Sequence, residues 1–334
     1  MKRVVLLVVC VGLLPIAGFA QIFTPGNVIF ADPFYRPDGQ IVEFEFDEAT
    51  GIGRIVQVIK WDIGEWERRR ALGLDIDPNG NVWVGITSTG SNDPEDPYPM
   101  GLGEALRIEP DGTQTFFPTD LVKATHLAAI GANKVILNSN HTDDATLAQL
   151  VDVTSGEAVL TNFNKTGHGE ALLLPDGRLL MGDSGTPGIL TYDLSGGDPT
   201  GVFYDDGRTV RSLTYNDQIG SVIALLQDQH TLIKVSLDGE LEAEYDAEWD
   251  QFVSLWGIAE IPGTTKIILG SHDIDETWNQ MAIYDTANFD AGPTIIEIME
   301  GFEEAGLAAD HVFQSFFNAA VVPEFTSVST WELH

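Results

Sequence analysis

Residues 171–182 read ALLLPDGRLLMG, which is an apolar run, a Pro-Asp-Gly turn and a second apolar run. The same arrangement recurs at 74–85 around Pro78-Asn79-Gly80 and at 258–270 around Pro262-Gly263, with looser copies at 128–137 and 213–225. Pro, Asn, Asp and Gly are the residues that tight hairpin turns require. Each copy therefore predicts two antiparallel β-strands, and the mostly apolar first strand is typical of a strand buried on both faces.

Each hairpin is one half of a longer repeat. A third run, which alternates apolar and polar residues, follows and ends at an acidic or hydroxyl residue. A fourth run with a less regular apolar pattern comes after it. The third runs end at Phe46-Asp47, Ile108-Glu109, Val151-Asp152, Tyr192-Asp193, Val235-Ser236 and Tyr284-Asp285. A period of about 40–50 residues with four short strands is typical of the blade of a β-propeller. The sequence predicts an all-β fold, a six-bladed β-propeller.

The two ends of the repeat region complement each other. The first unit begins at Asn27–Asp32, which matches a second strand, so its inner strand is missing. Near the other end, Phe313–Val322 is an apolar strand without outer partners, and Glu300–His311 before it is expected to form a short helix. We expect the C-terminal strand to complete the first blade, because closing the ring removes exposed sheet edges. Seven blades are the alternative, with Phe313–Trp331 as a small separate blade.

The N-terminus has the pattern of a secretory signal peptide. Lys2 and Arg3 precede the apolar run Val4–Leu14, and small residues follow at 18–20. Residues 1–20 are thus predicted to be a signal peptide and 21–334 a single propeller domain that is secreted or periplasmic. The one cysteine, Cys10, lies in the leader, which excludes disulfides and cysteine metal sites from the mature chain.

The composition is strongly acidic. The 334 residues carry 51 Asp and Glu against 17 Lys and Arg, a formal net charge of −34. Such a surface repels nucleic acid and anionic lipid, and it suits divalent cations, basic partners or a salty medium. We expect a monomer with no nucleic-acid partner and no membrane span, which binds a small molecule or glycan. A protein partner stays open.

Two segments carry a family resemblance. Val28-Ile29-Phe30-Ala31-Asp32, followed by Gly39-Gln40-Ile41-Val42-Glu43-Phe44, resembles the NHL-type propeller repeat, and Leu179–Asp183 is a weaker match. The chain as a whole is similar to six-bladed propellers of the NHL and SMP-30/gluconolactonase-like group. That resemblance implies a divalent cation (Ca, Mg or Zn) in the central channel, held by Glu, Asn and Asp, with Glu170 as the channel glutamate.

The histidines map to one face of the predicted propeller. Loops that enter inner strands and loops between second and third strands share the face around the channel mouth. The first kind of loop carries His126, His168 and His311, and the second kind carries His141, His230 and His272. Histidine suits metal ligation and acid–base chemistry near neutral pH.

Counting five residues back from each inner turn predicts a polar ring at this mouth. The positions are Gly73, His126, Glu170, Arg211 and Gly257. We expect Glu170 and His126 to hold the cation with Asn138 and Asp183 as further donors, and Arg211 to orient an anionic substrate. His168 or His141 would move protons. Trp256, His272 and Asp273 would contact the ligand.

The interpretation of this ring has alternatives. A water-filled, hydrogen-bonded channel would carry the same residue types, since polar residues belong in loops. The predicted function is binding, and metal-assisted hydrolysis or lactone opening, of a small polar or carbohydrate-derived molecule. The competing hypothesis is a non-catalytic secreted scaffold that uses the loop Thr87–Gly103 and the basic run Arg68–Arg70.

Overall fold

The computed structural model describes residues 22–32, 40–60, 69–88, 103–121, 124–139, 147–247, 255–271, 280–307 and 319–323. In these ranges the chain is all-β, with one turn of 3-10 helix, η1 (Phe289–Ala291). No helix in the described ranges is long and apolar enough to cross a bilayer. The predicted signal peptide, residues 1–20, lies outside the described residues.

Four sheets have four strands each, in antiparallel order. They consist of β4 (Arg69–Ile76), β5 (Val82–Ser88), β6 (Glu104–Ile108) and β7 (Gln114–Pro118); β8 (Ala124–Gly131), β9 (Lys134–Ser139), β10 (Ala148–Asp152) and β11 (Val159–Phe163); β12 (Ala171–Leu173), β13 (Leu179–Gly182), β14 (Ile189–Tyr192) and β15 (Gly201–Tyr204); and β16 (Val210–Asn216), β17 (Ser221–Leu226), β18 (Thr231–Ser236) and β19 (Leu241–Asp246).

The fifth sheet has eight strands and joins the two ends of the chain. Its order is β20 (Leu255–Glu260), β21 (Lys266–Ser271), β22 (Gln280–Asp285), β23 (Thr294–Glu300), β3 (Ile52–Lys60), β2 (Gln40–Asp47), β1 (Val28–Asp32) and β24 (Ala319–Val321). β23 and β3 pair in parallel, and Glu297 lies opposite Ile52. β24 pairs antiparallel with β1, which places Val321 opposite Val28.

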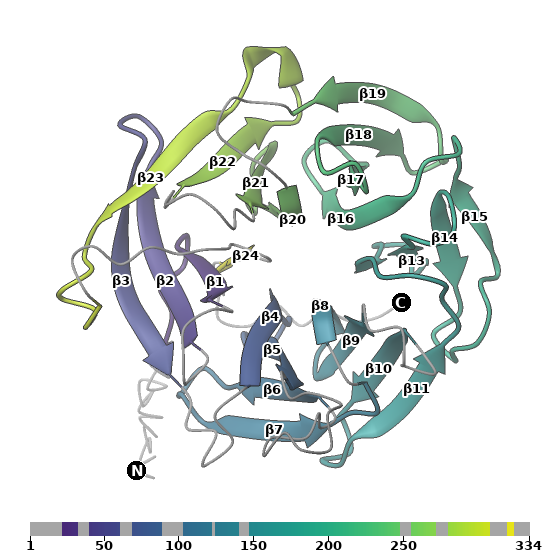
Figure 1. Ribbon diagram of the computed structural model, residues 1–334, viewed down its shortest axis with the longest axis horizontal. Helices are drawn as coiled ribbons and strands as arrows, with labels where there is room; N and C mark the ends of the chain where they lie inside the picture. Colours follow the sequence, from purple (N-terminus) through teal and green to yellow (C-terminus); the bar gives the residue numbers. More distant parts are fainter. Residues whose placement is uncertain are drawn as a thin grey trace, which may run out of the picture.

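The sheets stand around a central axis in a propeller-like ring (Figure 1). The innermost strands contact one another in a closed cycle, β4 to β8, β12, β16, β20, β24 and back to β4. Inner strands run through the ring in sequence order, so the residues at their beginnings gather at one face. This arrangement positions the site described below.

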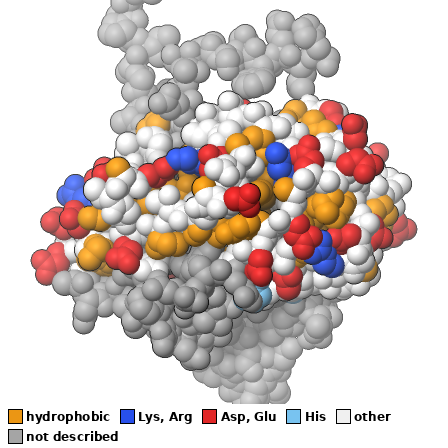
Figure 2. All heavy atoms as spheres, turned by 90° about the horizontal axis from the view of Figure 1, so that it is seen from above, with side chains coloured by type: hydrophobic (Ala, Val, Ile, Leu, Met, Phe, Trp, Pro, Cys, Tyr) orange, Lys and Arg blue, Asp and Glu red, His pale blue; other side chains and the backbone are white. Residues whose placement is uncertain are grey.

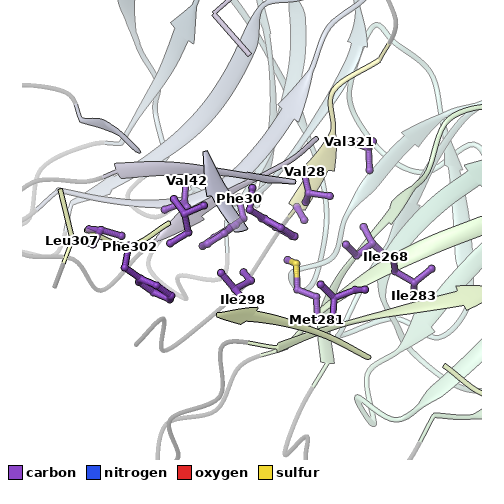
Figure 3. Close-up of a cluster of buried hydrophobic side chains, with 14 residues drawn as sticks. Val28, Phe30, Val42, Ile268, Met281, Ile283, Ile298, Phe302, Leu307 and Val321 are labelled. Carbon is purple, nitrogen blue, oxygen red and sulfur yellow. The ribbon is translucent and has the colours of Figure 1, made fainter. Parts of the chain in front are cut away.

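Apolar clusters fill the space between neighbouring sheets. One cluster joins the two halves of the eight-stranded sheet, with Phe30 and Val42 from one half facing Ile268 and Met281 from the other (Figure 3). Strands near the axis are buried on both faces; all of Ser221–Leu226 in β17 is buried, whereas the outer strand β19 is mostly exposed. Continuous apolar runs and alternating runs in the sequence therefore correspond to inner and outer strands.

The predicted helix at 300–311 is wrong over its described part. β23 continues to Glu300, and residues 301–307 form successive turns in which Gly301 and Gly306 adopt φ of 83° and 77°. Left-handed backbone at two glycines in six residues interrupts a helical hydrogen-bond ladder, and only glycine takes this conformation without steric cost.

Seen edge-on, the rim of the ring is acidic. Asp and Glu side chains are scattered over it with few Lys and Arg, and apolar side chains lie between them (Figure 2). Charge dispersed in this way keeps this side of the molecule solvated.

Candidate functional site

The channel mouth is shaped by β-bulges at the beginnings of inner strands. The pairing register shifts between Ala71 and Gly73 in β4, Ala124 and His126 in β8, Val210 and Ser212 in β16, and Leu255 and Gly257 in β20. In β16 and β20 the extra residues are Arg211 and Trp256. A bulge turns a side chain away from the regular alternation and is common beside functional sites. Ser212 therefore occupies the position in β16 that His126 occupies in β8 and Gly257 in β20. The prediction placed Arg211 at this position and was wrong by one residue.

Arg211 and Trp256 stack on each other. The guanidinium carbon of Arg211 lies 3.6 Å from the centre of the Trp256 ring, within the range of a cation–π contact. Arg211 is only 1% exposed, and its Nε has no hydrogen-bond partner among the residues that the structure describes. Within the described part of the chain, no carboxylate forms an ion pair with it.

Among the described residues, the positive charge of Arg211 is therefore buried without an opposite charge. Burial lowers the pKa of this guanidinium to about 10, so the group stays charged at neutral pH. An isolated buried charge is costly, and proteins keep one where a partner or ligand compensates it. Arg211 is the strongest candidate for a ligand contact at this mouth.

Two histidine rings lie beside Arg211. His126 and His168 stack with centroids 6.1 Å apart and planes 13° from parallel. His168 Nδ1 lies 3.1 Å from Ser184 Oγ, and its Nε2 lies 3.3 Å from Gln227 Nε2. Burial lowers the pKa of His126 well below its usual value of 6.5, and the charges of Arg211, His168 and Lys165 lower it further. His126 is therefore a neutral imidazole in the physiological range.

Glu170 reaches the mouth from the residue just before β12. Its Oε2 accepts hydrogen bonds from Ser212 Oγ and from Leu213 N, the latter at 3.1 Å. Burial raises the pKa of this carboxyl to about 8, against the lowering effect of these hydrogen bonds. Glu170 is thus mostly protonated at neutral pH.

This pKa predicts a pH dependence of stability that Glu170→Gln should remove. The pKa is raised from 4.5 to about 8 on folding, so the folded chain holds this proton to higher pH and stability falls as pH rises through that interval. Glutamine cannot ionise and can still accept from Ser212 and Leu213. At pH 9 we expect Glu170→Gln to be about 5 kcal/mol more stable than the wild type, with no difference in stability below pH 4.5. Urea denaturation across pH measures the difference.

The control for this experiment is Glu240→Gln, since Glu240 is exposed in the turn after β18. We expect its stability profile to run parallel to that of the wild type. A Glu170→Gln profile that is also parallel to the wild type would contradict a buried, protonated Glu170.

A lysine that the sequence did not single out lies between the predicted metal ligands. Lys165 Nζ donates hydrogen bonds to Asn138 Oδ1 at 2.9 Å and to the Gly169 carbonyl at 3.0 Å. Burial lowers the pKa of Lys165 to about 8, while the charges of Asp183 and Glu170 raise it. Its one sequence signal is its place in the loop Asn164–Gly169, which enters β12.

Asp183 is occupied by backbone and hydroxyl donors. Its carboxylate accepts from Thr166 N at 2.9 Å, from Thr166 Oγ1 at 3.1 Å and from Gly185 N at 2.8 Å. This carboxylate ties the loop before β12 to the loop after β13. Asp183 therefore has a structural function in holding the mouth together.

The predicted site residues fall into two groups. The structure brings His126, Asn138, Glu170, Asp183 and Lys165 into one connected cluster, with His168, Arg211 and Trp256 beside it. His141, His272 and Asp273 lie outside the described residues.

The donor set fits a divalent cation poorly. No three His, Cys, Asp or Glu side chains in the described ranges converge as a metal site would require. Glu170 is held by Ser212 and Leu213, and Asp183 by Thr166 and Gly185, whereas a bound Ca or Mg needs such oxygens turned toward it. A resident metal stays a prediction from the sequence.

Beside the mouth, a cavity of about 340 Å³ follows the channel along the inner strands. Glu170 lines it together with Asp75, Glu260 and mostly aliphatic residues such as Ala129 and Ile258. Burial raises the pKa of Asp75 to about 6 and that of Glu260 to about 7. The channel thus has three carboxyl groups on a mostly aliphatic wall, whereas Arg211 and Lys165 lie at its mouth. An anion would be favoured at the mouth.

Comparison with known proteins supports the fold and leaves the function open. No protein-family model and no curated protein matches the sequence. Among solved structures, the chain is similar to a structure of a nidogen/laminin complex (TM-score 0.58, 12% identity, 89% of this chain and 98% of that chain). It is also similar to streptogramin B lyase (TM-score 0.51, 11% identity, 81% and 88%) and to a candidate 6-phosphogluconolactonase from Bacteroides uniformis (TM-score 0.53, 14% identity, 78% and 79%).

These likenesses place the chain among proteins with the propeller fold. At identities of 11–14% they carry no residue roles. The three similar proteins differ in function, as is usual for a widely used fold. The function must therefore be argued from the site.

Proposed function

We propose that the channel mouth binds a small polar ligand that carries a carboxylate. The observation that carries this proposal is Arg211, which is 1% exposed, charged and without a carboxylate partner among the described residues. A guanidinium binds a carboxylate through two parallel hydrogen bonds, and burial strengthens the contact because water does not compete.

The surroundings of Arg211 select for a hydroxylated or ring-shaped ligand. Trp256 covers one face of the guanidinium, and the ligand would meet the N–H groups at its edge. The partly exposed ring of His168, stacked on the buried His126, offers an aromatic surface, and Gln227 and Ser184 contribute polar groups at its border. Aromatic faces next to amide and hydroxyl groups are the usual surroundings of a carbohydrate-derived ligand.

A lactone is the reactive form of such a ligand. Hydrolysis adds water to the ring ester and gives a hydroxy acid, whose new carboxylate is the group that Arg211 would hold. His168 is the candidate to accept the proton of the attacking water. The candidate 6-phosphogluconolactonase named above shares the fold, which makes lactones a rational first screen.

The same proposal includes the finer features of the fold. The eight-stranded sheet is interpreted as two four-stranded blades that meet at the parallel pair β23 and β3, which gives six blades with β24 completing the first. The leader at 1–20 supports export of the mature chain. The alternative scaffold function rests on Thr87–Gly103 and Arg68–Arg70, and most of these residues lie outside the described ranges.

The test is a calorimetric titration with gluconate and glucuronate, together with a hydrolysis assay on the corresponding lactones. We expect micromolar to millimolar binding of the acids that Arg211→Lys weakens by about tenfold, because lysine keeps the charge and loses the bidentate geometry. Sorbitol, an uncharged polyol, should bind far more weakly. Equal binding of sorbitol and gluconate would contradict a carboxylate site.

A further inference from the structure

The cluster around Lys165 is built around an ammonium group. Its Nζ lies 2.9 Å from Asn138 Oδ1 and 3.0 Å from the carbonyl oxygen of Gly169. Asn138 is fully buried, and Lys165 itself is partly buried. A hydrogen-bonded lysine in this position is held firmly, since leaving the oxygen of Asn138 without a donor would cost stability.

All four residues that the sequence assigned to a cation interact with this lysine. Asn138 accepts its hydrogen bond, and the carboxyl groups of Asp183 and Glu170 raise its pKa when they are ionised. The charge of Lys165 in turn acts on His126. A positive charge that belongs to the chain therefore lies among the side chains that the sequence assigned to a metal ion.

An ammonium group suits these neighbours better than a divalent ion does. It is a compact cation with three donors, and one carbonyl and one amide oxygen accept two of them here. Ca or Mg would require six or more oxygens, including ionised carboxylates. Asp183 has its oxygens occupied by Thr166 and Gly185, and Ser212 and Leu213 hold Glu170.

We infer that Lys165 is a built-in cation that takes the place of a metal ion at this channel mouth, so that the mouth is assembled without a divalent cation. Lys165 ties the loop before β12 to Asn138 on β9, which links two neighbouring sheets. It also adds a second positive group close to His126. The inference concerns how the mouth is held together and does not require the proposed ligand to be correct.

The first experiment measures the melting temperature of the full-length mature protein with EDTA and with Ca, Mg, Mn or Zn. We expect no change with any of these additions, because no metal contributes to the folded state. A melting temperature that falls with EDTA and is restored by one metal, with the effect lost in Glu170→Gln, would overturn the inference.

The second experiment removes the ammonium group by mutation and then supplies one from solution. Lys165→Ala removes the group and is expected to lower the melting temperature by about 5 °C, because Asn138 then lacks its donor. Propylammonium matches the deleted atoms and should restore at least half of the loss, whereas 1-propanol should not.

The matched control is Lys134→Ala. Lys134 pairs with Asp152 at 2.8 Å on the surface, and its side chain is 42% exposed. This variant should change the melting temperature by a degree or less and should not respond to propylammonium. A Lys165→Ala protein as stable as this control would overturn the inference. If Lys165→Ala does not fold, the metal titration of the wild type decides alone.

Discussion

Replacing Arg211 with methionine is expected to make the protein more stable and to abolish carboxylate binding. Methionine fills a similar volume against Trp256 and removes a buried charge that no described carboxylate compensates. We expect the free energy of unfolding to rise by about 1–3 kcal/mol, because replacing buried charges with apolar side chains often stabilises a protein by this amount. The affinity for gluconate should fall by about 100-fold or more with the loss of a bidentate contact.

The combination of the two effects distinguishes a functional arginine from a structural one. The control is Arg208→Met, on the loop before the same strand, where the guanidinium pairs with Asp206 and with Glu244 at 2.8 Å. This exposed network should contribute little to stability, and its loss should leave gluconate binding unchanged. If Arg211→Met destabilises the protein and binding persists, Arg211 is part of the core and not of a ligand site.

The second large change, a loss of stability, is expected from Asp77→Ala. Asp77 is 1% exposed in the turn between β4 and β5. Its carboxylate accepts hydrogen bonds from five donors, namely Asn79 N at 2.8 Å, Asn81 N at 3.1 Å, Asn81 Nδ2 at 2.8 Å, Trp83 Nε1 at 3.0 Å and Asn133 N at 3.0 Å. The last of these donors belongs to the β8–β9 turn, so this one side chain connects two neighbouring sheets.

Truncating Asp77 leaves several buried donors without an acceptor. Trp83, which is fully buried, loses the partner of its indole N–H. Unsatisfied buried donors cost about 1–3 kcal/mol each, and partial relaxation leaves an expected total of about 3–5 kcal/mol. Urea denaturation should show this as a lower midpoint with an unchanged slope.

The control for Asp77→Ala is Asp193→Ala. Asp193 also lies in a turn, but it is exposed and accepts from Ser195 N at 2.8 Å. We expect its removal to cost less than about 1 kcal/mol. Equal losses in the two variants would show that the hydrogen bonds between sheets contribute nothing beyond those of an ordinary turn.

The fold could be predicted because each repeat carries its own turn chemistry. Pro175-Asp176-Gly177 marks a hairpin wherever it occurs, and Gly177 adopts the positive φ of 90° that such a turn requires. The apolar strand near the C-terminus had no partner in sequence, and the structure pairs it with β1. Local periodicity cannot show the parallel contact between β23 and β3, which depends on how the outer strands of two units meet.

The prediction of the site misplaced one residue, Arg211, and missed one charged side chain, that of Lys165. Counting back from the turns placed Arg211 level with His126 and Glu170, but β16 pairs without interruption from Asn216 back to Ser212, so Ser212 holds that level and Arg211 is the bulged residue before it, stacked on Trp256. The count began one residue too early, because Asn216 resembles a turn residue and is the last paired residue of the strand. Lys165 was missed for a different reason: a lone lysine in a loop is usually solvated, and only the three-dimensional contacts show it enclosed by Asn138 and Gly169.

Binding of a ligand carboxylate to Arg211 can be followed by the NMR resonance of its Nε–H. This group is buried and has no partner among the described residues, so its signal should respond strongly to a bound anion. We predict that acetate and gluconate shift the Arg211 signal in a saturable manner, while acetamide, the neutral analogue of acetate, does not. An Arg211 signal that does not shift with either carboxylate, or that shifts equally with acetamide, would show that Arg211 does not bind a carboxylate.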